Sequence, residues 1–162
     1  MEVKEKILRA YRRVLSNDVH LLRADANERS ITHRFAIYLE QEFPEFNVDC
    51  EYNRKGLEVK RLPSFGIDPR TTEQLGINLY PDIIVHHRGT DDNLVAIEAK
   101  PSSKNAPCKK PQQRECECDR CKLRAYKADL GYQHTFYVVF PVGNELERFT
   151  DAKLADYVAE IQ

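Results

Sequence analysis

The stretch YPDIIVHHRGTDDNLVAIEAK, residues 80–100, constrains the fold more than any other part of the chain. Two runs rich in aliphatic and β-branched residues flank a polar segment, RGTDDN, whose Gly and Asp residues suit a turn. The pattern predicts two strands, near 79–87 and 94–100, that pair as a hairpin. Three charged residues interrupt these otherwise apolar runs. Burying a charge in a sheet is unfavourable unless it is paired or hydrogen-bonded, so these residues need an explanation.

The three charged residues are Asp82, Glu98 and Lys100. Strand alternation puts Glu98 and Lys100 on one face, and a hairpin folded about residues 89–92 brings positions near 82 and 98 opposite each other. Two carboxylates so close are unfavourable unless a cation lies between them, and oxygen ligands favour Mg²⁺ or Mn²⁺. Alternatively, Asp82 caps a turn while Glu98 and Lys100 form a salt bridge at a solvated strand end.

The rest of the chain alternates between helical and extended patterns. Asp25 or Asn27 is a plausible cap for the second predicted helix, and Gly131 is a stop signal for the third. The expected elements are helices at 3–15 and 27–43, a strand at 46–53, a long excursion at 54–76, the two strands above, a helix at 118–131, a strand at 134–142 and a closing helix at 150–162. The closing helix would turn Leu154, Tyr157, Val158 and Ile161 inward.

From residue 27 the order is helix, three strands, helix, strand, which predicts an α/β fold with a mixed central sheet and flanking helices. The first three strands form a meander, and the crossover helix returns the fourth strand to the sheet. With 162 residues, 41% of them apolar, we expect a single domain over residues 1–162. No segment approaches the roughly 20 apolar residues of a membrane span, so we expect a cytoplasmic protein with no membrane partner.

Asp82 after Pro81, followed after fifteen intervening residues by Glu98-Ala99-Lys100, resembles the PD-(D/E)XK signature of restriction-endonuclease-like nucleases. The predicted element order is also that of this superfamily's core, and the resemblance covers about residues 27–141. It implies a restriction-endonuclease-like core and a metal-dependent hydrolase. The expected activity is that of a DNA endonuclease in restriction, repair or defence, in which a metal-bound water attacks the phosphate in line and expels the 3′ oxygen.

The resemblance also implies residue roles. Asp82 and Glu98 would ligate Mg²⁺ or Mn²⁺ together with the backbone carbonyl of Ala99. Lys100 would orient the attacking water or help to deprotonate it, and would stabilise charge on the phosphate. Glu28 resembles an acidic residue that many members carry on the helix before the sheet, where it contacts the metal through water. It is equally well explained as a favourable carboxylate in the first turn of a helix.

A basic region begins at the end of the predicted strand 94–100. Residues 100–127 hold nine Lys and Arg against three acids, a local balance of +6, whereas the whole chain has a net charge of −1. The asymmetry suits a surface that faces DNA, or RNA, and a solvated basic loop and helix face explains it equally well. The expected phosphate contacts are Lys104, Lys122 and Tyr126, although Lys122 and Tyr126 also fit an ordinary amphipathic helix.

Four of the five cysteines, Cys108, Cys116, Cys118 and Cys121, lie within fourteen residues in a Cys-rich insertion at about 101–121, and Cys50 is far upstream. An odd count without a signal peptide argues against a disulfide framework. The cluster could hold a structural Zn²⁺, remain as free thiols or bind an iron–sulfur cluster. No role is assigned to the histidines.

Two other functions compete with the nuclease. The first is a non-catalytic nucleic-acid or protein-binding module on the same fold, against which the complete set of Asp82, Glu98 and Lys100 argues. The second is a zinc-stabilised interaction protein in which the acid pair is accidental. A homodimer would suit a nuclease that cuts two strands, since that needs two sites, but the sequence leaves the oligomeric state open.

Overall fold

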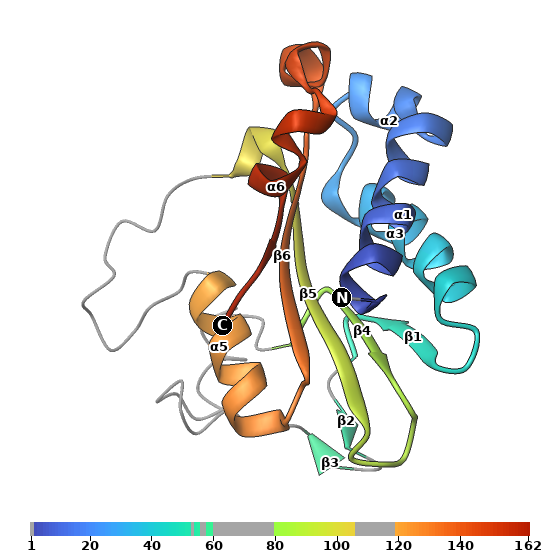
Figure 1. The fold of residues 1–162 in the computed structure, drawn as a ribbon, viewed down its shortest axis with the longest axis vertical. Helices are drawn as coiled ribbons and strands as arrows, with labels where there is room; N and C mark the ends of the chain where they lie inside the picture. Colours follow the sequence, from blue (N-terminus) through green and yellow to red (C-terminus); the bar gives the residue numbers. More distant parts are fainter. Residues whose placement is uncertain (1, 53, 56–57, 60–79, 106–118) are drawn as a thin grey trace.

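The computed structural model describes residues 2–52, 54–55, 58–59, 80–105 and 119–162. They form a mixed α/β structure around a five-stranded sheet of order β1-β4-β5-β6-β7 (Figure 1). The strands are β1 (Asn47–Cys50), β4 (Ile83–His86), β5 (Asn93–Pro101), β6 (His134–Phe140) and β7 (Val158–Glu160). The main helices are α1 (Glu2–Asn17), α3 (Glu28–Glu42) and α5 (Asp119–Leu130). Shorter elements are α2 (Val19–Arg23), β2 (Arg54–Lys55), β3 (Glu58–Val59), α6 (Leu154–Tyr157) and the 3₁₀ turns η2 (Ser102–Lys104), η3 (Gly143–Arg148) and η4 (Asp151–Lys153).

The sheet topology follows the order expected from the sequence. β1, β4 and β5 form an antiparallel meander, and β6 lies parallel to β5 after the crossover through α5. In the β4–β5 hairpin, Ile83 pairs with Ile97 and Ile84 with Ala96, which carries position 82 opposite position 98. The predicted hairpin register is therefore confirmed, with β4 beginning at Ile83 rather than near residue 79.

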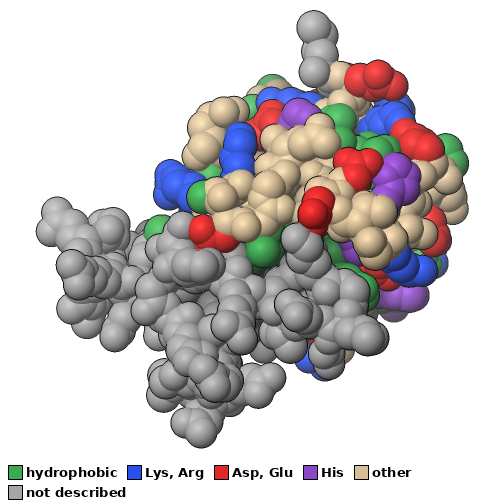
Figure 2. Space-filling view, turned by 90° about the horizontal axis from the view of Figure 1, so that it is seen from below, with side chains coloured by type: hydrophobic (Ala, Val, Ile, Leu, Met, Phe, Trp, Pro, Cys, Tyr) green, Lys and Arg blue, Asp and Glu red, His purple; other side chains and the backbone are tan. Residues whose placement is uncertain are grey.

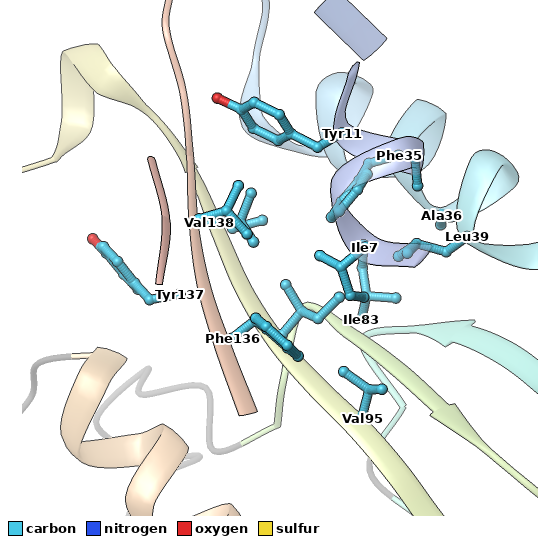
Figure 3. Packing of buried hydrophobic residues seen from close by; sticks show 14 of the residues in the cluster. Ile7, Tyr11, Phe35, Ala36, Leu39, Ile83, Val95, Phe136, Tyr137 and Val138 are labelled. Carbon is cyan, nitrogen blue, oxygen red and sulfur yellow. The ribbon is translucent and has the colours of Figure 1, made fainter. Parts of the chain in front are cut away.

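α1 and α3 cover one face of the sheet, and α5 lies on the other (Figure 1). The face toward α1 and α3 is packed with aromatic side chains. The ring centroids of Tyr11 and Phe140 lie 5.0 Å apart in a stacked arrangement, and those of Phe35 and Phe140 lie 5.3 Å apart in an edge-on arrangement. Figure 3 shows Phe136 and Val138 of β6 on this side and Tyr137 on the opposite side, toward α5. Because strand residues alternate between faces, Glu98 and Lys100 share the α5 side with Tyr137.

Local signals set the helix ends. The Asn27 side chain accepts a hydrogen bond from the backbone N–H of Ser30 at 2.9 Å and caps α3, so Asn27 is the cap of the two predicted candidates. Gly131 follows α5 with φ +69°, a left-handed conformation that glycine adopts without strain, which confirms it as the stop signal.

The predicted closing helix at 150–162 is wrong. Only η4 and the four residues of α6 are helical, and β7 then pairs antiparallel with β6. The cause is the edge of β6, whose backbone would otherwise lack partners: Ile161 N–H donates to the Thr135 carbonyl at 2.8 Å, and Thr135 Oγ1 donates to the Ile161 carbonyl at 2.9 Å. The four residues expected to face inward are nonetheless buried.

Two further differences concern short elements. α2 was not predicted from the sequence, and the excursion predicted at 54–76 begins with a small antiparallel hairpin of β2 and β3. Residues 56–57 and 60–76 of that excursion lie outside the described residues. Among the described residues no helix is long and apolar enough to cross a membrane.

Candidate metal and catalytic site

The end of the β4–β5 hairpin brings Asp82 and Glu98 together. Asp82 directly precedes β4, and its Oδ2 accepts a hydrogen bond from the backbone N–H of Ala99 at 2.8 Å. Its own carbonyl accepts from the N–H of Glu51 at 3.0 Å. Asp82 is thus fixed to the backbone on both sides, beside the strand that carries Glu98.

Glu98 is a buried carboxylate, with 3% of its surface exposed. The Tyr126 hydroxyl donates to its Oε1 at 3.2 Å, and the Lys122 ammonium lies 3.7 Å from its Oε2. Burial raises the pKa of Glu98 well above its ordinary value, and the Asp82 charge adds to the increase, while Lys122 opposes it. Both partners come from α5, so the helix that covers this face of the sheet also supplies the groups around Glu98.

The pKa of Asp82 is raised to about 6. Burial is the largest cause, and the negative charges of Glu28 and Asp119 add to it, whereas the Ala99 hydrogen bond and Lys122 oppose it. Glu28, in the first turn of α3, therefore acts electrostatically on Asp82, as its predicted place near the metal requires. Its position in that first turn is equally consistent with the helix-dipole interpretation.

Lys100 does not pair with Glu98 as the salt-bridge alternative supposed. Its ammonium is paired with Oδ2 of Asp119, the first residue of α5, and Oδ1 of Asp119 accepts from Lys122 at 2.9 Å. Burial lowers the pKa of Lys100, but the hydrogen bond and charge of Asp119 outweigh it, so the pKa is raised overall. At neutral pH the lysine is a cation.

Asp119 is the residue of this site that sequence reasoning missed. An acid in the first turn of a helix is an ordinary capping signal, and the sequence gives no register between α5 and β5. The one available signal was its spacing, since Asp119 and Lys122 are three residues apart and such pairs meet on a helix surface.

The charges of this site do not balance. Four carboxylates, Glu28, Asp82, Glu98 and Asp119, act on two ammonium groups, Lys100 and Lys122. With all four carboxylates ionised, the site would carry two more negative than positive charges, which one divalent cation of the hard type that oxygen ligands bind would neutralise. Within the described ranges no three His, Cys, Asp or Glu side chains converge as a complete metal cage. A carboxylate pair completed by a carbonyl, waters and a substrate oxygen is how Mg²⁺ is commonly held.

The residues expected to contact phosphate differ in accessibility. Lys104 is exposed in η2, just beyond the end of β5. Lys122 has 13% of its side chain exposed and Tyr126 is fully buried, and both contact Glu98. The basic region is thus divided between an exposed lysine at the strand end and groups inside the site.

The cysteine cluster falls largely outside the described residues. Cys108, Cys116 and Cys118 belong to that part, so the zinc, thiol and iron–sulfur alternatives stay open. Cys121 is half-buried on α5, and Cys50 is exposed at the end of β1. Burial is the largest of the effects that raise the pKa of Cys50 to about 11, so its thiol is protonated at neutral pH.

A hollow with a volume of about 590 Å³ lies beyond the end of β5, against η3 and α6. Its lining includes the acids Asp25 and Glu145 and the bases Arg148 and Lys153, so its charge is balanced and favours no ion. On the face drawn in Figure 2, acidic, basic and histidine side chains are interspersed among the coloured residues. The charge imbalance of the Asp82–Glu98 site is what distinguishes it.

A separate carboxylate cluster provides a contrast. Asp49 of β1 accepts from Arg88 Nε at 2.8 Å and lies 2.8 Å from Nε2 of His86. The hydrogen bond from Arg88 is the largest cause that lowers the pKa of Asp49. This aspartate is fully paired, and its chemistry is that of a structural ion pair.

Comparison with known proteins gives no match: no family model, curated protein or solved structure resembles the chain closely enough to count. The functional argument therefore depends on the residues and their geometry.

Proposed function

We propose that the protein is a metal-dependent nuclease that hydrolyses phosphodiester bonds of DNA. One observation carries the proposal: the buried Glu98 and the half-buried Asp82 lie opposite each other at the end of the β4–β5 hairpin, both with raised pKa values, in a site where four carboxylates meet two ammonium groups. A fold tolerates such a site poorly without a cation, and perturbed acids of this kind are typical of catalytic centres.

The order of elements supports the same proposal. Apart from the separate β2–β3 hairpin and η2, the elements from α3 to β6 follow the order helix, three strands, helix, strand: α3, β1, β4, β5, α5 and β6. This order, with Asp82 before β4 and Glu98-Ala99-Lys100 in β5, resembles the restriction-endonuclease-like core. The residues of the motif therefore lie on the same elements of the fold that the resemblance implies for them.

Asp82 and Glu98 would hold Mg²⁺ or Mn²⁺, with the carbonyl of Ala99 as a further ligand and Glu28 acting through water. The bound cation would supply Lewis acidity toward the scissile phosphate and a water of lowered pKa. Tyr126 restrains the Glu98 carboxylate by donating to Oε1, and Lys122 partly neutralises it. These contacts keep Glu98 oriented, as hydrogen-bonded neighbours of metal ligands commonly do.

Lys100 would act as a hydrogen-bond donor and a positive charge. Its raised pKa keeps it protonated at neutral pH, which favours orientation of the water and stabilisation of the phosphate over proton abstraction. Lys104, exposed three residues past the end of β5, would contact the DNA backbone as a point charge. An endonuclease in restriction, repair or defence fits these roles, and a homodimer would supply the two sites that duplex cleavage needs.

The test compares wild-type protein with Glu98→Ala, and with Asp49→Asn as a matched control from the paired cluster. Labelled single-stranded, duplex and branched DNA and single-stranded RNA are incubated with Mg²⁺, Mn²⁺ or chelator. We expect cleavage that needs metal, persists in Asp49→Asn and is lost in Glu98→Ala. Cleavage by Glu98→Ala at the wild-type rate would contradict the proposal. Wild-type protein that binds DNA but cuts nothing in any combination would favour the non-catalytic binding module.

A further inference from the structure

Asp119 lies at the centre of a chain of charged contacts that joins α5 to β5. Its Oδ2 pairs with Lys100 and its Oδ1 with Lys122, and Lys122 in turn approaches Glu98. Only 12% of the Asp119 side chain is exposed. One carboxylate therefore connects the lysine and the glutamate of the same strand through the first turn of a helix.

The two lysines are unequally exposed. Lys100 has 25% of its side chain exposed and Lys122 has 13%, so Lys100 is the ammonium that a substrate would meet first. A free lysine side chain samples many rotamers, and ordering it costs conformational entropy. The paired Asp119 oxygen removes this freedom before any substrate arrives, which is how a site is preorganised.

We propose that Asp119 is a positioning residue: its carboxylate holds the Lys100 ammonium toward the scissile phosphate and Lys122 against Glu98. The inference rests on the proposed nuclease function and deepens it. Asp119 acts through Lys100, so its removal should affect turnover more than substrate affinity. A carboxylate that only stabilised the start of α5 would affect stability and leave the two lysines' roles unchanged.

The kinetic test uses Asp119→Asn, Asp119→Glu, Lys100→Ala and the double variant Asp119→Asn with Lys100→Ala. We expect Asp119→Asn to lower kcat about 10- to 100-fold with KM changed less than about 3-fold. In the Lys100→Ala background the same change should lower kcat less than about 3-fold further, because its effect passes through Lys100. Asp119→Glu should recover part of kcat. Circular dichroism and urea unfolding of each variant are the control for the stability of α5.

Three kinetic results would overturn the inference: wild-type kcat in Asp119→Asn, an undiminished effect of that change in the Lys100→Ala background, or a change in KM alone. A second readout does not need activity. The ¹⁵Nζ NMR signal of the Lys100 ammonium, assigned by its absence from Lys100→Ala, should be observable in the wild type and broadened by solvent exchange in Asp119→Asn.

The two readouts separate two kinds of failure. If wild-type protein cuts no substrate, the proposed function fails, and the NMR signal alone then decides whether Asp119 restrains Lys100. An unchanged Lys100 signal in Asp119→Asn would overturn the positioning role whatever the activity.

Discussion

Two carboxylate clusters lie on the α5 face of the same sheet, one around Asp49 and the other around Asp82 and Glu98. Asp49 is paired with Arg88 and His86, and its pKa is lowered. Asp82 and Glu98 have raised pKa values, and burial is the largest cause at both. The same residue type on the same surface thus experiences opposite electrostatic environments.

The difference separates a structural ion pair from a pair of acids whose neutral forms the fold favours. In the Asp49 cluster the ionised acid is the stable form, because a guanidinium satisfies it. In the Asp82–Glu98 site the fold favours protonation, so an ionised pair needs an added cation. The ionised Asp49 therefore stabilises the folded state, whereas ionised Asp82 and Glu98 destabilise it. This contrast is expected when the Asp49 cluster has a structural role and the Asp82–Glu98 site has a functional one.

The largest expected difference between the clusters is in activity. Asp82→Asn keeps the acceptor for Ala99 N–H but loses the charge, and should lower kcat at least ~10³-fold. Asp49→Asn should stay within about 3-fold of wild type. Rates are measured on the best DNA substrate in Mg²⁺, and equal losses in the two variants would remove the distinction between the clusters.

The next difference is in stability: Asp82→Asn and Asp49→Asn should change the free energy of unfolding in opposite directions. At pH 7 without metal, Asp82→Asn should raise the free energy of unfolding by about 1–3 kcal/mol. With a pKa of about 6, Asp82 is ionised at this pH, and its ionised form is less stable in the folded state than in the unfolded state. Asp49→Asn should lower it by about 1–2 kcal/mol, because Arg88 loses its charged partner. Urea unfolding measures both, and a destabilised Asp82→Asn would contradict the assignment.

The pH dependence should separate the same two variants. The gain of Asp82→Asn should be absent below the ordinary aspartate pKa of 3.8, grow as pH rises to about 6 and remain constant above. The cost of Asp49→Asn should be fully present at pH 7 and fade as pH falls below 3.8, because the pKa of Asp49 is lowered. Thermal unfolding of wild type and variants between pH 3.5 and 8 follows both trends, and parallel curves would contradict them.

The smallest expected effect concerns the support of Glu98. Tyr126→Phe removes the hydroxyl that donates to Oε1 and leaves the ring in the core. We expect about a 10-fold loss of kcat, the usual order for a group that orients a metal ligand. Tyr132→Phe, also in the core, is the control for tyrosine packing. An equal loss in both would show that packing, and not the contact with Glu98, matters.

Strand alternation and turn chemistry were sufficient to predict the sheet and the part of the site that lies on it. Asp82, Glu98 and Lys100 are separated by fixed distances along two paired strands, so the hairpin register alone brings them together. Asp119 could not be found in this way, because its contact with Lys100 depends on how α5 packs on β5. The fold of the closing segment could not be predicted for a similar reason. Its sequence has a helical pattern, but part of it pairs as β7 with the edge of β6, a long-range contact that the local pattern does not contain.

Calorimetric titration of the full chain with Mn²⁺ in the absence of DNA would show whether Asp82 and Glu98 form a site for a divalent cation. Wild type and Asp49→Asn should bind the metal with similar affinity, whereas Glu98→Gln, which keeps the shape of the side chain, should show no binding in the same concentration range. Binding to Glu98→Gln with wild-type affinity and stoichiometry would contradict the account.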